Sequence, residues 1–168
     1  MPKKDKPKST VKSSVSKSSS KDDKTKPTNK TKVEEKDNFI VLLKSTASKI
    51  SPKSEGEIGY EIVKDDKGVL YLRLTSNTSS GNFCKTPVLL QSVIDILAKQ
   101  DVVEPFTSKI MKDVFQGKGS NNSNNKSFLM AACRSNDMKL IVSDTDKALM
   151  SRLHKDFKSH SENLLAMK

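Results

Sequence analysis

Aromatic residues are scarce in this sequence, which has no tryptophan, 2 tyrosines and 6 phenylalanines among 168 residues. Leucine, isoleucine, valine and methionine must therefore fill most of any hydrophobic core. Cysteine is equally scarce, and Cys84 and Cys133 show no CxxC spacing. This pattern excludes a disulfide-rich secreted scaffold and a cysteine zinc ribbon, and it favours two reduced thiols. Cys133 lies in an apolar run and is expected to be a small core residue.

The sequence also lacks long apolar runs and a secretory leader. No segment approaches the roughly 20 apolar residues that a membrane-spanning helix needs. The N-terminus has no hydrophobic stretch of the kind found in signal peptides. We therefore expect a soluble, cytoplasmic protein that does not insert into a membrane, and one associated with the nucleoid if it binds DNA.

Motifs for catalysis, metals and cofactors are missing as well. His154 and His160 are six residues apart, which does not place them on one face of a helix, so we expect surface histidines and no metal site. The Gly/Ser loop at 77–81 lacks the lysine of a phosphate-binding P-loop. No nucleophile elbow surrounds any serine. We expect neither enzymatic activity nor a cofactor.

Positive charge is abundant and unevenly distributed. The chain has 31 Lys and Arg against 20 Asp and Glu, a formal net charge of +11, and residues 1–36 alone hold 12 lysines and 5 acids. Because this segment has too few apolar residues to offset the entropy of ordering, we expect a disordered basic tail at 1–36 and one folded domain at 37–168. Such a tail suggests a polyanionic partner, nucleic acid or an anionic membrane surface; alternatively, it only solubilises the chain.

The folded part opens with an ambiguous apolar segment. Between residues 38 and 50, apolar residues recur at near-helical spacing, which predicts a helix. A strand through 39–43 is the alternative, because this short run is apolar on both faces. The helix would end before the Ser51–Pro52 step.

A clearer pattern follows. Alternating apolar residues at 57–64 and 69–76 flank a turn at 65–68, which predicts an antiparallel β-hairpin with one face on the core. On the opposite face, Tyr71 and Arg73 are candidate contacts to nucleic acid. The alternative is that they are an ordinary solvated pair.

Two helices are predicted next. Residues 88–99 carry a one-sided stripe of leucine, valine and isoleucine, typical of an amphipathic helix. A second helix begins after Thr107 or Ser108 and ends at Gly117, because a glycine just past a helix is its usual stop.

A third helix and a strand complete this region. Residues 128–134 favour a helix because alanine and methionine are poor strand formers. The alternative is a second hairpin in which 128–134 pairs with 139–143. Residues 138–142 have the β-branched character of a strand, and no second strand is visible directly after them.

Polar residues gather at the start of the third helix. In recognition helices this is where base edges and phosphates are contacted: asparagine matches adenine, and lysine or arginine suits phosphate or guanine. The candidate nucleic-acid contacts are Lys118, Asn124, Asn125, Lys126 and Arg134, together with Tyr71 and Arg73. A cluster of Asn, Ser and Gly is also typical of a flexible loop.

The C-terminal region predicts one long helix. From Thr145 to about Leu165, apolar residues recur every three or four positions. Such a helix would either close the domain or pair with another protein or its own copy in a homodimer.

Residues 88–142 resemble a winged or otherwise modified helix-turn-helix unit. The resemblance is at the level of the fold, and it implies contact with duplex DNA through the third helix. The sequence thus predicts a small α+β domain with a hairpin, a helical triplet of winged-helix type and a long C-terminal helix, behind a basic tail. The predicted function is that of a DNA-binding regulator or accessory factor. The alternative is a non-enzymatic protein-interaction module with a solubilising or extended basic tail.

Overall fold

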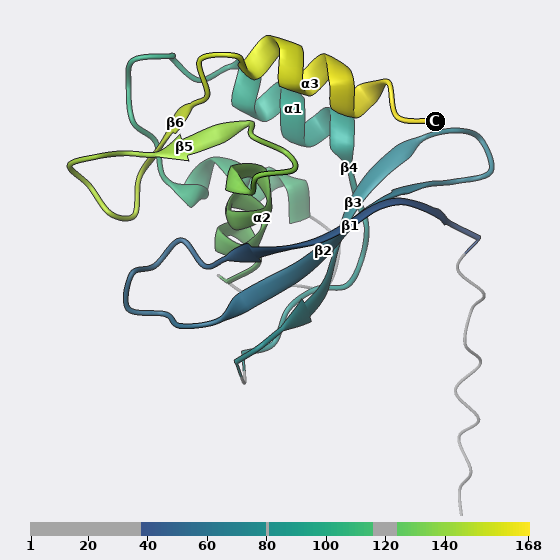
Figure 1. Cartoon of the computed structure of the whole chain (residues 1–168), viewed down its shortest axis with the longest axis horizontal. Helices are drawn as coiled ribbons and strands as arrows, with labels where there is room; N and C mark the ends of the chain where they lie inside the picture. Colours follow the sequence, from purple (N-terminus) through teal and green to yellow (C-terminus); the bar gives the residue numbers. More distant parts are fainter. Residues whose placement is uncertain (1–37, 80, 116–123) are drawn as a thin grey trace, which may run out of the picture. The chain divides into compact units, whose positions relative to one another are not determined.

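An antiparallel sheet of four strands frames the fold (Figure 1). The computed structural model describes residues 38–79, 81–115 and 124–168. The strands lie side by side in chain order, and they are β1 Ile40–Ser48, β2 Glu57–Lys64, β3 Leu70–Asn77 and β4 Val88–Leu89. The predicted basic tail at 1–36 lies outside the described residues, so the domain boundary at 37 stays a prediction.

Strand β1 stands where a helix was predicted, so the helix at 38–50 is wrong and the strand alternative is confirmed. It pairs with β2 from Ile40 opposite Lys64 to Ser48 opposite Glu57, with a β-bulge between Val41 and Leu43. The reason lies in β2, which is buried along almost its whole length on both faces. A buried strand needs hydrogen-bonding partners along both edges, and β1 and β3 supply them.

Strands β2 and β3 form the predicted antiparallel hairpin. Asp65 closes its turn, because Oδ1 accepts hydrogen bonds from the backbone N–H groups of Lys67 (3.0 Å) and Val69 (2.7 Å). Gly68 has a φ of +81°, a backbone conformation that glycine adopts without steric penalty. The local turn chemistry was therefore sufficient to predict this element.

Three helical segments follow the sheet: α1 Leu90–Ala98, the 3-10 helix η1 Ser108–Phe115 and α2 Asn124–Arg134. The three predicted helices are present, although residues 88 and 89 of the first form β4. The second is a 3-10 helix, and its predicted end at Gly117 lies outside the described residues. Because 128–134 is helical, the alternative second hairpin is wrong.

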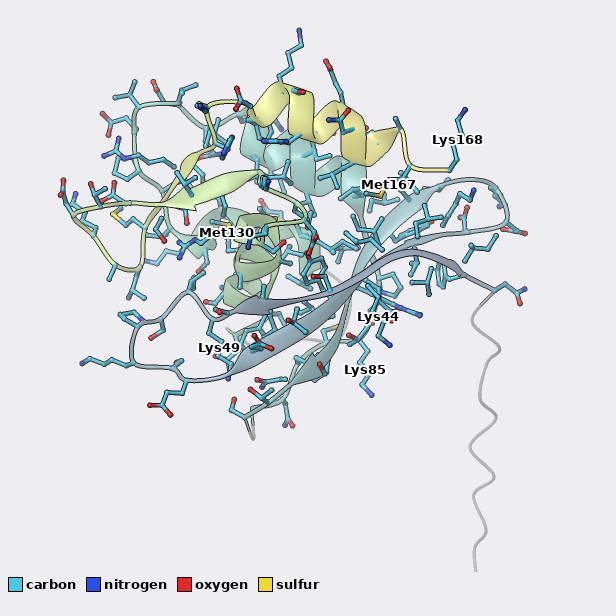
Figure 2. The ribbon with its side chains drawn as sticks, viewed as in Figure 1. Lys44, Lys49, Lys85, Met130, Met167 and Lys168 are labelled. Carbon is cyan, nitrogen blue, oxygen red and sulfur yellow. The ribbon has the colours of Figure 1, made fainter. Side chains whose placement is uncertain are left out.

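Helix α2 is the most deeply buried of these segments. From Phe128 to Cys133 no residue is more than 7% exposed, and Met130 is completely buried (Figure 2). The helix packs against η1, β1, β2 and β5. A helix covered on this many sides has to be apolar nearly all round, as its sequence is.

A second, two-stranded sheet follows α2, formed by β5 Ile141–Ser143 and β6 Ser151–Leu153. Phe106 forms an isolated antiparallel bridge to Ser151 on β6. The strand predicted at 138–142 is confirmed in part, over Ile141 and Val142. The expectation that no second strand follows is wrong.

The long C-terminal helix predicted from Thr145 to Leu165 is also wrong, since only α3 Phe157–Leu165 is helical there. Ser151 and Leu153 are buried on either side of a half-buried residue, which is the alternation of a strand. The backbone N–H and C=O groups of Ser151 both pair with Phe106 at 2.8 Å. This non-local pairing outweighs the helical spacing of the local sequence.

The described residues thus form a mixed α+β fold, as predicted. Helices α1 and α3 lie side by side (Figure 1). One hydrophobic core joins the sheet to α1, η1 and α2; its largest fully buried side chains include Tyr60, Ile58, Ile62, Leu72, Leu90, Leu97, Met111, Leu129, Met130, Met138, Leu140 and Ile141. No helix in the described part of the chain is long and apolar enough to cross a membrane.

Candidate nucleic-acid interface

The predicted contact residues at the start of α2 do not share one exposed face. Asn124 is exposed and Lys126 is half-buried, whereas Asn125 is completely buried. Oδ1 of Asn125 accepts a hydrogen bond from the backbone N–H of Cys84 (2.9 Å), so this amide ties α2 to the loop before β4. Asn125 is therefore not accessible to a ligand. Lys118 lies outside the described residues.

Arg134 connects the end of α2 to β6. Its Nη2 donates hydrogen bonds to Oγ of Ser151 (2.7 Å) and to the backbone carbonyl of Met150 (3.3 Å). Burial lowers the pKa of the guanidinium, and Nε is buried without a hydrogen-bond partner among the described residues. The half-buried side chain therefore has a structural role in joining α2 to β6.

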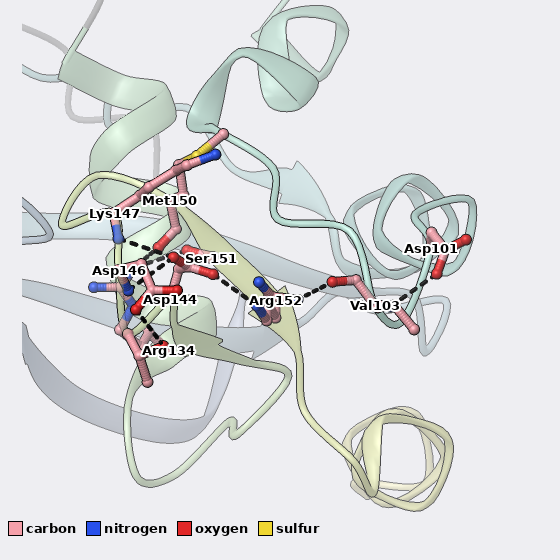
Figure 3. A network of polar contacts seen from close by, with 10 residues as sticks. Asp101, Val103, Arg134, Asp144, Asp146, Lys147, Met150, Ser151 and Arg152 are labelled. Atoms are coloured by element: carbon pink, nitrogen blue, oxygen red, sulfur yellow. Dashed lines mark hydrogen bonds and ion pairs between the residues drawn. The ribbon is translucent and has the colours of Figure 1, made fainter.

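A second polar network holds the β5–β6 hairpin (Figure 3). Nε of Arg152 donates to Oδ2 of Asp144 at 2.6 Å, and Arg152 also donates to the backbone carbonyl of Val103. Oδ1 of Asp144 accepts hydrogen bonds from the backbone N–H groups of Asp146 (3.0 Å) and Lys147 (2.9 Å). The Arg152 hydrogen bond, aided by these two, lowers the pKa of Asp144. The network therefore stabilises the turn between the two strands.

Tyr71 and Arg73 lie on the face of the sheet opposite the core, and both have partners within the chain. Nε of Arg73 donates to Oε2 of Glu61 (2.9 Å), and Nζ of Lys44 lies 3.6 Å from Oε1 of the same carboxylate. The Tyr71 hydroxyl donates to Oδ2 of Asp65 (3.3 Å). Because the carboxylates partly neutralise the cations here, this face is a weaker candidate for binding an anion.

A pocket of about 330 Å³ lies where the end of β1 meets the first turns of η1 and α2, and we call it the lysine pocket. Its lining contains two lysines, one amide and five hydroxyl groups, and it contains no carboxylate. The lining residues are Lys49, Ile50, Ser51, Ser54, Thr107, Ser108, Lys109, Asn124, Ser127, Phe128 and Leu149. Of the predicted contact residues that the structure describes, only Asn124 lines it.

The two lysines of the pocket come from different segments. Nζ of Lys49, labelled in Figure 2, donates to Oγ of Ser79 (2.7 Å) and lies 3.4 Å from the carbonyl oxygen of Glu55. It also lies 6.0 Å from the centre of the Phe128 ring. An ammonium group has three N–H donors, so at least one remains for a ligand. Lys109, at the start of η1, is exposed.

Two other pockets differ from the lysine pocket in charge. One, of about 460 Å³, is lined by Glu57 and Asp137 beside Arg134. The other, of about 450 Å³ along α1, is lined by Asp95 and Asp113 beside a single lysine. Among these three pockets of the described part, the lysine pocket is the one whose charge suits an anionic ligand.

The thiol of Cys133 lies in the core and is not reactive. Cys133 is completely buried, as predicted, and neither cysteine forms a disulfide. Burial raises the pKa of the Cys133 thiol to about 12. Since the thiolate is the nucleophilic form, Cys133 is inert near neutral pH.

The two histidines are closer than predicted. The ring centroids of His154 and His160 lie 4.7 Å apart. The expectation that they do not share a helical face rested on their spacing in a helix, whereas α3 begins only at Phe157 and His154 lies in the turn before it. The turn brings the two half-buried rings together.

Comparisons with known proteins place the chain in no family. No family model matches it, and no curated protein and no solved structure matches it either.

Proposed function

We propose that the protein binds duplex DNA through the phosphate backbone, with the lysine pocket holding a phosphate group. The observation that carries this proposal is the composition of the pocket, whose polar lining consists of Lys49, Lys109, an amide and five hydroxyls without a carboxylate, beside the apolar side chains of Ile50, Phe128 and Leu149. Lysine, asparagine, serine and threonine side chains are among those that contact phosphates in protein–DNA complexes.

The first turn of α2 strengthens the attraction for an anion. Asn124 and Ser127, both in that turn, line the lysine pocket. The N-terminus of a helix carries a partial positive charge and unpaired N–H groups, which favour a phosphate nearby. The N-terminus of α2 and the two lysines would therefore both attract a bound anion.

The order of the elements supports a winged-helix type of contact. Helices α1, η1 and α2 are followed by the β5–β6 hairpin, and Phe106 adds a bridge to β6. In a winged-helix protein the third helix of this series faces the duplex. Because α2 is buried from Phe128 to Cys133, only its first turn is available. Contacts to phosphates carry no sequence information directly, so we expect weak sequence preference.

The basic segment at 1–36 would add affinity. Its 12 lysines exceed its acids by 7. Each phosphate that a lysine neutralises releases counterions, so binding weakens as salt rises, by a slope of about −0.9 per contact in a double-logarithmic plot for duplex DNA. The pocket and the segment would therefore contribute separately to one salt-dependent affinity.

The test is fluorescence anisotropy of a labelled duplex with the full-length chain at several salt concentrations. The double variant Lys49→Ala/Lys109→Ala removes both pocket cations, and we expect weaker binding and a salt slope smaller by about 0.9, the value for the one phosphate that the pocket holds. The matched control is Lys53→Ala/Lys112→Ala, which removes two exposed lysines from the same two segments but outside the pocket. Equal losses in both double variants, or no loss in either, would refute the role of the pocket.

The alternative function, a protein-interaction module, has a distinct outcome in the same assay. The full-length chain would then bind duplex DNA, single-stranded DNA and RNA only through its net charge of +11, and this binding would disappear as salt rises to the physiological concentration. Tighter binding to either single-stranded probe than to the duplex would instead reject duplex DNA as the partner while keeping the phosphate contacts.

A further inference from the structure

Three metal-ligating side chains meet at the junction of β6 and α3. One ring nitrogen from each of His154 and His160 and one carboxylate oxygen of Asp156 lie within 4.8 Å of one another. Nδ1 of His154 lies 3.9 Å from Oδ2 of Asp156. The only two histidines of the chain are thus in the same place as an acidic side chain.

The backbone explains why they meet. The backbone N–H of His154 donates a hydrogen bond to the carbonyl of Leu140 (3.0 Å). The backbone carbonyl of His154 accepts one from the N–H of Phe157 (2.9 Å), and this bond closes a turn just before α3. The N–H of His160 donates to the carbonyl of Asp156 (3.0 Å). Residues four apart on a helix share a face. The turn therefore brings His154 to the face that Asp156 and His160 already share.

One polar atom of these three residues is buried without a partner among the described residues. Nε2 of His160 is buried and makes no hydrogen bond within the described part of the chain. The ring meets that of His154 edge-on at 4.7 Å, and the N–H of Asp156 donates to Nδ1 of His154 (3.1 Å). Buried polar atoms without partners are rare in folded proteins, and a bound ion can satisfy such an atom.

We propose that His154, Asp156 and His160 bind a divalent transition-metal ion, for which Zn²⁺ is the probe. Two imidazole nitrogens and one carboxylate oxygen form a donor set that zinc uses with a water in the fourth position. Imidazole ligands disfavour magnesium and calcium, which prefer oxygen. The metal ion would bind His154 either through Nε2 or through Nδ1, and in the second case it would displace the hydrogen bond that Nδ1 accepts from the Asp156 N–H.

The geometry needs only a small side-chain adjustment. In a tetrahedral site with bonds of about 2.0–2.2 Å, ligand atoms lie about 3.4 Å apart. The Asp156 side chain is 55% exposed, so it can rotate inward without disturbing the core. The bound ion would join the end of β6 to the first turns of α3.

The experiment uses the full-length chain without a histidine tag, titrated with zinc chloride. We expect one ion per chain by calorimetry and simultaneous shifts of the C–H resonances of both histidines by NMR. The variants His154→Ala, His160→Ala and Asp156→Asn should each weaken Zn²⁺ binding by about tenfold or more. The matched control Glu162→Gln, an exposed acid on α3, should bind as the wild type does.

Cys84→Ser provides a second control, because a half-exposed thiol can itself bind zinc. Loss of binding in Cys84→Ser with full binding in His154→Ala would overturn the proposal. So would the absence of saturable binding, or histidine resonances that stay unchanged. If His160→Ala does not fold, His154→Ala and Asp156→Asn, whose side chains lie outside the core, decide the outcome.

Discussion

Replacing Arg134 by alanine tests whether this residue stabilises the fold or contacts DNA. The wild-type guanidinium makes two hydrogen bonds across to β6, one of 2.7 Å and one of 3.3 Å. Hydrogen bonds from a charged group contribute about 1.5–3 kcal/mol each when well formed, and the longer bond counts for less. The variant also removes the buried Nε that has no partner in the described part, and the loss of this unsatisfied donor increases the free energy of unfolding by about 1 kcal/mol. The free energy of unfolding should therefore fall by about 2 kcal/mol.

Urea denaturation followed by circular dichroism measures this change. The control is Lys126→Ala, a half-buried cation on the same helix, which should change stability by less than about 0.5 kcal/mol. Under conditions where both variants are folded, Arg134→Ala should bind duplex DNA as tightly as the wild type does. An unchanged unfolding free energy together with weakened DNA binding would refute the structural role of Arg134.

Three further predictions concern buried groups. Since the pKa of Asp144 is lowered in the folded state, the carboxyl group takes up a proton in the unfolded chain first as pH falls. The Asp144→Asn variant should therefore be less stable than the wild type at pH 7, and this difference should shrink below the ordinary pKa of 3.8. Urea midpoints measured across this pH range test the prediction. Tyr60→Phe removes a hydrogen bond of 2.5 Å to Ser135 and should reduce stability by about 1 kcal/mol, with a double-mutant cycle against Ser135→Ala to isolate the pair. Iodoacetamide should modify Cys84 in the native protein but reach Cys133 only after unfolding. Equal rates of alkylation of the two thiols in the native protein, measured by mass spectrometry, would contradict the burial of Cys133.

Local signals predicted the elements whose causes are local. The β2–β3 hairpin follows from alternation and from a turn closed by Asp65 and Gly68, all within a short stretch of chain. Helix α1 follows from a one-sided apolar stripe, and its buried residues all belong to that stripe, although Leu89, the first residue of the stripe, is exposed and lies in β4. In both cases the residues that decide the conformation are sequence neighbours.

Elements decided by distant residues were missed. Residues 39–43 satisfy both helical and strand patterns, and the choice depends on pairing with β2, which begins at Glu57. Likewise, Ser151 of β6 pairs with Ser143 of β5, and it also forms an isolated bridge to Phe106, which is 45 positions earlier. Sequence spacing within each segment contains no information about these partners.

The candidate sites were missed for the same reason. The lysine pocket combines Lys49 from the end of β1 with Lys109 from η1, and nothing near either residue marks it as a ligand contact. Asn125 was predicted as a contact because it lies in the Asn-rich start of the third helix, yet its amide is used to hold the backbone of Cys84. The histidine pair would have been visible only if a turn had been predicted before Phe157.

The position of β1 at the rim of the sheet has a consequence for solubility. Strand β1 pairs only with β2 among the described strands, so its other edge is where a strand from a second molecule could add to the sheet. Two features oppose such association: the irregularity between Val41 and Leu43 bends the edge, and Lys44, 76% exposed, adds a charge there. A chain that lost both would expose a flat apolar margin containing Ile40 and Val41, and it should precipitate at concentrations where the natural sequence stays dispersed.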